Sequence, residues 1–285
     1  GIRIYKIPGV MISNDARGCF DRIVLSIGAL AMRRLGVPWK AISALVDTLT
    51  NMRHYIRTAH GDSENFYTGS RSKPLQGGGQ GNAAAGPMWL AVSIILLSIM
   101  ATLPINATII TAISLQTLVF SAIMYVDDTD LFFLGTRSDD NVSMTKKAQK
   151  MIDKWCSTLW LTGGCLRPDK CWWYLLDFKW NQDGSWRYAT KQDTPGELVI
   201  PDHQLQEEQI DRFEPHVGQE TLGTFLAPDG NNKAQYEKML RTTKEWAARM
   251  KRGYMSKFSA ELSVHTRIMK SLEYPTAAIT LTEKE

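Results

Sequence analysis

The chain has 285 residues, of which 44% are hydrophobic, so it can bury a sizeable core as one or two domains. Its formal net charge of +4 is mildly basic, which favours nucleic acid over cationic partners. The four cysteines form no Cys-x-x-Cys pair and no secretory signal is visible, which argues against structural zinc and favours an intracellular protein, in the nucleus or the cytoplasm.

Charge is distributed unevenly along the C-terminal part of the chain. Residues 231–270 carry ten Lys or Arg against three Asp or Glu, whereas residues 191–230 carry two against nine. A basic block on a polar helix is the expected footprint for a phosphate backbone, although a solvated helix face has the same composition.

A long segment without charge supports a different interpretation. No charged residue occurs between Pro74 and Val126, and residues 88–100 are apolar enough to suggest a membrane helix. Pro104 limits that run, and its apolar core is shorter than the roughly 20 residues that span a bilayer. We therefore expect a buried helix and no membrane partner.

Hydrophobic periodicity predicts the elements of the first half of the chain. Alternating runs predict strands at residues 2–5, 8–15, 54–58 and 64–68. Helical spacing predicts helices at residues 22–35, 38–52 and 83–101.

The second half continues the same mixture. Strands are predicted at residues 118–124, 129–134, 170–180, 186–190 and 221–226. Helices are predicted from Asp139 or Asp140 to about Leu159, and twice after Asn231 with a break at Gly253. The acidic, proline-bearing stretch 191–216 is predicted to be a loop. This order of hairpins and returning helices indicates an α+β fold with an antiparallel sheet and flanking helices.

The tetrapeptide Tyr125-Val126-Asp127-Asp128 lies between two apolar runs, which predicts a hairpin with both carboxylates at its turn. Two adjacent acids are costly unless a cation holds them, and oxygen ligands suit Mg²⁺. Asp is also common in solvated turns, so the tetrapeptide alone does not decide between the two interpretations.

A second acid and a glycine-rich turn extend this pattern. Asp15 ends a predicted strand, and if that strand neighbours the hairpin, three acids converge on a point suited to two metal ions. The run from Gln76 to Pro87 contains Gly77-Gly78-Gly79-Gln80-Gly81 and opens a helix, where backbone N–H groups can approach a nucleotide.

In this order the motifs resemble the catalytic palm of reverse transcriptases. Asp15 to Asp21 is similar to the family's first palm motif, the Gln-Gly turn to the second, and Tyr125-Val126-Asp127-Asp128 to the third, YxDD. Leu166 to Cys171 resembles the fourth motif, and Thr221-Leu222-Gly223-Thr224 the primer-grip hairpin. The form Phe20-Asp21-Arg22 is closest to retrotransposons of the non-LTR type.

The resemblance implies a role for each matching residue. Asp15, Asp127 and Asp128 would bind Mg²⁺, with Mn²⁺ as an alternative, and Lys170 would protonate the leaving pyrophosphate. The implied substrate-binding residues are Gly18, Cys19, Phe20, Gln80, Gly81, Tyr125, Leu222 and Gly223. Phe20 would stack under the sugar and exclude a 2′-hydroxyl; Gln76 competes with Gln80 for the glutamine role.

The predicted activity is RNA-directed DNA polymerisation, in which a primer 3′-hydroxyl attacks a dNTP on an RNA or DNA template. We expect a palm over residues 1–230 and a partial helical thumb over 231–285, with the fingers absent from this chain and no obligate protein partner. Without fingers the fragment could be inactive, so a decayed element that only binds nucleic acid is one alternative. An RNA-dependent RNA polymerase is another, against which Phe20 argues.

Overall fold

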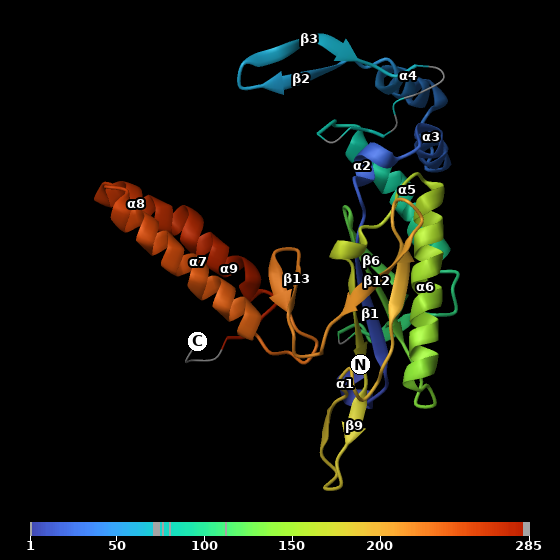
Figure 1. Cartoon of the computed structure of the whole chain (residues 1–285), viewed down its shortest axis with the longest axis vertical. Coiled ribbons are helices and arrows are strands. Elements are labelled where there is room, and N and C mark those ends of the chain that lie inside the picture. The colour runs from blue at the N-terminus through green and yellow to red at the C-terminus, as the bar shows by residue number, and fades with distance from the viewer. Residues whose placement is uncertain (1, 71–74, 76, 80, 112, 282–285) are drawn as a thin grey trace. The chain divides into compact units, whose positions relative to one another are not determined.

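The computed structural model describes residues 2–70, 75, 77–79, 81–111 and 113–281. The chain divides into two compact units (Figure 1). One unit consists of Gly1–Asp177 and Thr194–Arg212, and the other of Phe178–Asp193 and Phe213–Glu285.

A six-stranded sheet forms the centre of the first unit, in the order β11-β12-β8-β1-β7-β6. Its strands are β1 (Gly9–Asp15), β6 (Ala122–Tyr125), β7 (Asp128–Leu134), β8 (Trp172–Leu176), β11 (Leu198–Pro201) and β12 (Glu207–Arg212). All neighbours are antiparallel except β12 and β8, which are parallel. The predicted α+β class with a mainly antiparallel sheet is confirmed.

Alternation along the two central strands gives the sheet one buried face and one more accessible face. Ile12 of β1 and Leu131 of β7 are fully buried, and they are Cα partners in the register. Asp15 and Asp128 are also partners, and they fall on the opposite face because successive side chains alternate. The acids therefore share the open face of the sheet.

Two long helices supply the apolar cover. α5 (Ala85–Met100) and α6 (Asn141–Leu161) contact each other and pack on the sheet (Figure 1). The apolar side chains that recur at helical spacing along α6 are fully buried, including Trp155, and Asp140, one of the two predicted caps, accepts from the Ser143 N–H at 2.8 Å. No helix among the described residues is long and apolar enough to span a membrane.

Smaller elements surround this core. The short helices are α1 (Ile2–Tyr5), α2 (Cys19–Arg22), α3 (Leu25–Arg34), α4 (Trp39–Thr50) and a 3-10 turn at Pro168–Lys170. Two hairpins, β2–β3 (His54–Thr58, Gly61–Tyr67) and β4–β5 (Ala107–Ile110, Thr117–Phe120), form separate two-stranded sheets. The predicted helices at residues 22–35, 38–52 and 83–101 are confirmed within a few residues.

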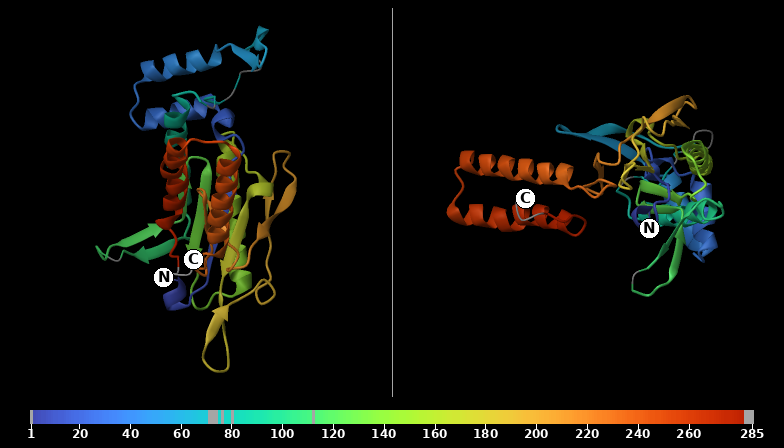
Figure 2. Two further views of the ribbon diagram at one scale, coloured as in Figure 1. Left: turned by 90° about the vertical axis from the view of Figure 1, so that its left-hand side faces the viewer. Right: turned by 90° about the horizontal axis from the view of Figure 1, so that it is seen from below.

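The second unit is built from two hairpins and a helical pair. The hairpins are β9–β10 (Phe178–Trp180, Trp186–Tyr188) and β13–β14 (Gln219–Thr221, Thr224–Leu226). α7 (Lys233–Arg252) runs beside a second helical segment made of α8 (Lys257–Ser263), a π-helical turn (Val264–Ile268) and α9 (Met269–Thr276) (Figure 2). The predicted break at Gly253 is confirmed.

The prediction of a loop over residues 191–216 is wrong, because β11 and β12 lie within it. β11 buries Leu198 and Ile200, and β12 buries Ile210, while the exposed side chains of β12 include Glu207 and Glu208. Acidic residues that suggested a loop are the solvent-exposed side chains of a strand whose apolar side chain, Ile210, is buried.

Three smaller predictions were also wrong. Residues 2–5 form the helical turn α1, closed by a hydrogen bond of 2.8 Å from the Lys6 N–H to the Ile2 carbonyl. The run 118–124 is two strands, since Ser121 interrupts it and β5 and β6 pair with different partners. The run 170–180 is likewise divided into β8 and β9. Short apolar runs do not reveal where pairing changes.

The β11 edge of the sheet is covered by a side chain of α6. The Gln149 amide donates to the Val199 carbonyl at 2.8 Å and accepts from the Val199 N–H at 3.0 Å. The side chain thereby makes the two hydrogen bonds that a further strand would make with Val199.

Candidate active site

The β6–β7 turn carries the tetrapeptide as predicted. Tyr125 and Asp128 are Cα partners that close the hairpin, and Val126 and Asp127 are its two turn residues. Val126 has a φ of 58°, which is rare for a β-branched residue, and Asp127 is not among the positive-φ residues. A positive φ at only the first central position is the pattern of a type II′ turn.

Asp15 at the end of β1 lies directly opposite Asp128. Side chains opposite each other on antiparallel strands have Cβ atoms about 4.5–5.5 Å apart, so the carboxylates repel. The pKa of Asp128 is raised, first by partial burial and then by the charges of Asp127 and Asp15. The three predicted acids therefore lie within electrostatic reach of one another.

Lys170 offsets part of this negative charge. Its Nζ lies 2.9 Å from Oδ2 of Asp15, and its charge lowers the pKa of Asp128. The segment before Lys170 is fixed to the end of β1, because the Arg167 N–H donates to the Asp15 carbonyl at 3.0 Å and the Arg17 N–H to the Cys165 carbonyl at 2.8 Å. The fourth predicted motif thus meets the first.

The acids fit a hard divalent cation by their chemistry, since carboxylate oxygens are the ligands that Mg²⁺ prefers. Within the part of the chain that the structure describes, no three His, Cys, Asp or Glu side chains are grouped closely enough to hold a metal ion. Lys170 pairs with Asp15 in this arrangement, so a cation and the ammonium group would compete for the same carboxylate.

The segment after Asp15 makes close backbone contact with the glycine-rich turn. The Gly78 N–H donates to the Phe20 carbonyl at 2.7 Å, and the Gly77 N–H to the Ile23 carbonyl at 2.9 Å. A Cβ on Gly77 would lie 2.4 Å from the backbone of Asp21, so only glycine fits there. The first and second predicted motifs are therefore adjacent.

The remaining candidates of the first unit differ in exposure. Gly18 has a φ of 56° and precedes α2, and Cys19 is buried, which raises its pKa to about 12 and keeps the thiol protonated. Tyr125 is exposed beside Asp128 on the open face. Gly81 has a φ of 88° with no neighbour at its Cβ position, while Gln76 and Gln80 lie outside the described residues.

Leu222 and Gly223 belong to the second unit. They form the β13–β14 turn with φ values of 50° and 81°, both in the left-handed region. The Tyr274 hydroxyl donates to the Leu222 carbonyl at 2.8 Å, and Lys238 donates to the Gly223 carbonyl at 2.7 Å. Helices α7 and α9 thus hold the predicted primer-grip turn.

The structure adds two residues that were not predicted. Asp130 is the Cα partner of Ser13 and shares the face of Asp128; its pKa is raised, chiefly by burial. Trp89 of α5 is buried and donates its indole N–H to the Val126 carbonyl. The spacing of Asp128 and Asp130 by two residues could have revealed the first, whereas no local pattern signals the second.

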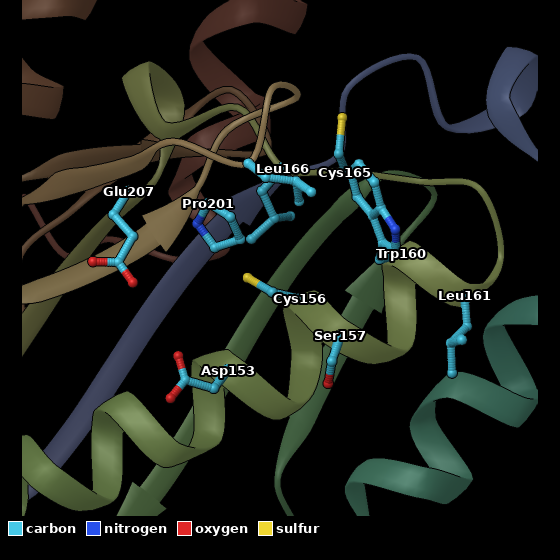
Figure 3. Close-up of a pocket in the computed structure, with 10 residues that line it drawn as sticks. Asp153, Cys156, Ser157, Trp160, Leu161, Cys165, Leu166, Pro201 and Glu207 are labelled. Carbon is cyan, nitrogen blue, oxygen red and sulfur yellow. The ribbon is translucent and has the colours of Figure 1, made fainter.

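A cavity of about 660 Å³ lies apart from these residues, between α6 and the β11–β12 hairpin (Figure 3). Cys156, Trp160 and Pro201 give it an apolar lining, and the carboxylates of Asp153 and Glu207 also border it. Burial raises the pKa of Cys156 to about 12, so its thiol is not a nucleophile at neutral pH. Leu166, the first residue of the predicted fourth motif, lines this cavity, but none of the residues given a catalytic or substrate-binding role does.

No protein-family model matches the chain, and no curated protein matches it. Among solved structures it is similar to telomerase from Candida tropicalis in complex with a fragment of telomeric RNA, with 13% identity and a TM-score of 0.40 over 59% of this chain and 26% of that one. It is also similar to apo telomerase of the same organism truncated from its C-terminal domain, with 10% identity and a TM-score of 0.39 over 73% of this chain and 37% of that one. At these scores the likeness carries no argument about function.

Proposed function

We propose that the chain is the catalytic part of an RNA-directed DNA polymerase of retrotransposon type, closest to the non-LTR elements. The observation that carries the proposal is the register that sets Asp15 opposite Asp128, with Asp127 in the adjoining turn and Lys170 on Asp15. In this proposal the first unit is the palm and the helical pair of the second unit is part of the thumb.

The reaction is the transfer of a nucleotidyl group to a primer. The primer 3′-hydroxyl loses its proton to solvent, its oxygen bonds to the α-phosphorus of a dNTP, the α–β phosphoanhydride bond breaks, and pyrophosphate leaves with the bonding electron pair. Asp15, Asp127 and Asp128 would hold Mg²⁺, which would supply Lewis-acid activation and neutralise phosphate charge. The protein contributes mainly positioning and electrostatic stabilisation.

Individual side chains have separate tasks in this reaction. Lys170, whose ammonium group pairs with Asp15, would give a proton to the departing pyrophosphate. Phe20 lies under the sugar of the incoming nucleotide, and Tyr125 contacts the primer end. Gly18 and Cys19 offer backbone groups to the triphosphate, and Gln80 and Gly81 contact the incoming nucleotide. Leu222 and Gly223 support the primer strand, whose phosphates meet the basic residues of α7.

Primer extension on an RNA template tests the acids. Asp127→Asn should reduce extension by at least about a thousandfold, because it removes one charge from the metal-binding set. Asp183→Asn is the matched control, since Asp183 also lies between two hairpin strands but belongs to β9–β10. Equal extension by wild type and Asp127→Asn would refute the metal site; binding of primer–template without extension by wild type would favour a decayed element.

Sugar selectivity separates a DNA polymerase from an RNA polymerase. Phe20→Ala should raise incorporation of ribonucleotides relative to deoxyribonucleotides, because the space for a 2′-hydroxyl opens. The ratio of kcat/KM for the two nucleotides is the measurement. An unchanged ratio would sink the assignment of Phe20, and a wild-type preference for ribonucleotides would favour the RNA polymerase.

A further inference from the structure

The catalytic turn contains a residue in an unfavourable conformation. Val126 is the first central residue of the β6–β7 turn, with a φ of 58°. That position of a type II′ turn normally holds glycine, since a branched Cβ crowds the backbone there. Such a conformation persists only where its surroundings enforce it, so something must hold Val126 in place.

Trp89 is the side chain that does so. It lies near the start of α5, is 4% exposed, and donates its indole N–H to the Val126 carbonyl. The bond fixes the peptide that joins Val126 to Asp127, and with it the direction in which the two carboxylates leave the turn. The turn is thus attached to the helix that begins at the glycine-rich segment.

The same indole also contacts Phe20, the residue proposed to exclude a 2′-hydroxyl. The rings of Phe20 and Trp89 meet edge to face, with centroids 6.4 Å apart and an interplanar angle of 69°. Phe20, Trp89, Met124 and Val126 line one apolar cavity of about 260 Å³. A single side chain therefore contacts residues of the first and third motifs.

Burial alone does not account for the bond. The indole nitrogens of Trp155 and Trp173 are also buried, and they have no hydrogen-bond partner among the described residues. This fold therefore tolerates a buried indole N–H without a partner, and the bond from Trp89 is specific to the turn.

We propose that Trp89 is a positioning residue: it holds the Val126 carbonyl, fixes the direction in which Asp127 and Asp128 leave the turn, and links that turn to Phe20. The inference rests on the proposed polymerase function for its effect on rate. The hydrogen bond and the strain that it counters do not depend on that function, so they can be tested without it.

A double-mutant cycle between Trp89→Phe and Val126→Gly isolates the contact. Phenylalanine keeps an aromatic ring but removes the N–H donor, and glycine adopts a positive φ without the crowding. The readouts are the folding equilibrium constant from denaturant unfolding, and kcat and KM for dNTP on a fixed primer–template. Trp155→Phe, alone and combined with Val126→Gly, is the matched control.

With Val126 present, Trp89→Phe should lower kcat about tenfold, the size of one hydrogen bond, with KM for dNTP changed less. In the Val126→Gly background the loss should shrink to about threefold or less, because glycine needs no restraint. The folding equilibrium constant should show the same coupling between Trp89 and Val126, and none between Trp155 and Val126.

Several outcomes would overturn the proposal. Trp89→Phe could reduce kcat and stability by the same factor in both backgrounds, or its effect on kcat could be no larger than that of Trp155→Phe. Failure of Trp89→Phe to fold in both backgrounds would make Trp89 a purely structural residue. A wild-type chain without extension activity would contradict the polymerase proposal alone, and the coupling in unfolding would still decide the role of Trp89.

Discussion

Two hairpin turns of this chain each contain a positive-φ residue whose carbonyl accepts a hydrogen bond from a helix side chain, but only the β6–β7 turn carries acidic residues. The β6–β7 turn places Val126 at a φ of 58°, and the β13–β14 turn places Leu222 at 50°. In each, a side chain from a helix donates to the carbonyl of the strained residue, the Trp89 indole in one and the Tyr274 hydroxyl in the other.

The two turns differ in the residues after the strained position and in the burial of the anchoring side chain. Asp127 and Asp128 come after Val126, and the anchor Trp89 is buried. Gly223 comes after Leu222, and the anchor Tyr274 is 62% exposed. A buried anchor loses less to competition with water, so the turn that carries the charges is held more firmly.

The largest expected difference between the turns is in catalysis. Asp128→Asn should lower the extension rate at least about a thousandfold, since in the proposed mechanism it removes one charge from the metal-binding acids while the isosteric amide leaves the fold intact. Leu222→Asn should lower it less than about tenfold, because in the proposed mechanism Leu222 affects only the placement of the primer strand. Single-turnover extension with saturating primer–template measures both rates. Comparable losses in the two variants would contradict the different roles proposed for the two turns.

A smaller effect concerns strain in the second turn. Leu222→Asn creates Asn-Gly at two positive-φ positions, the pair that type I′ turns prefer, and should raise the free energy of unfolding by about 0.5–1 kcal/mol. The exposed Leu222 side chain gives up little packing. Thr221→Asn is the control, because Thr221 is not a positive-φ residue and should gain nothing. Denaturant unfolding is the measurement, and a loss of stability would show that Leu222 is not strained.

The smallest expected effect is a pH-dependent gain in stability when Asp128 of the β6–β7 turn is replaced by Asn. Burial and the neighbouring acids raise the pKa of Asp128 above its ordinary 3.8, so the folded chain binds that proton more tightly than the unfolded chain. The resulting destabilisation is present above the raised pKa and vanishes below 3.8. Without divalent metal, Asp128→Asn should therefore be more stable than wild type at pH 7, with the gain fading as the pH falls toward 4.

The control variant, Asp183→Asn, should change stability at pH 7 in the opposite direction. Hydrogen bonds from Ser185 lower the pKa of Asp183, so Asp183→Asn should lose stability at pH 7 and approach wild type as the pH falls. Unfolding free energies measured at several pH values with a chelator present compare the two. A loss of stability at pH 7 in Asp128→Asn would mean that the acids do not repel one another.

Local patterns predicted those parts of the fold that are fixed by nearby sequence. The apolar residues of α6 recur every three or four positions, its Asp140 cap directly precedes its first turn, and the β6–β7 hairpin is closed by residues three apart. The placement of Asp15 beside Asp128 was predicted only as a condition, because it depends on which strands pair. The resemblance to the palm of reverse transcriptases implied that these strands are neighbours.

The parts that local patterns missed depend on contacts between distant segments. β12 joins the central sheet by pairing with β8, which is distant in sequence, and Lys170 reaches Asp15 because the backbone of Arg167 bonds to that of Asp15. The bond from Trp89 to Val126 joins residues 37 positions apart. In each case the local structure depends on a partner that is distant in sequence, so a local sequence pattern does not reveal it.

The Gln149 amide on Val199 has a consequence for association between molecules. An uncovered edge strand is a template on which another chain can add a strand, and natural proteins block such edges. Gln149 occupies both the N–H and the carbonyl of Val199, in the middle of the four-residue strand β11. A chain with Gln149→Leu should therefore fold with the same sheet but self-associate at high concentration, because a single side chain on α6 ends the sheet at this edge.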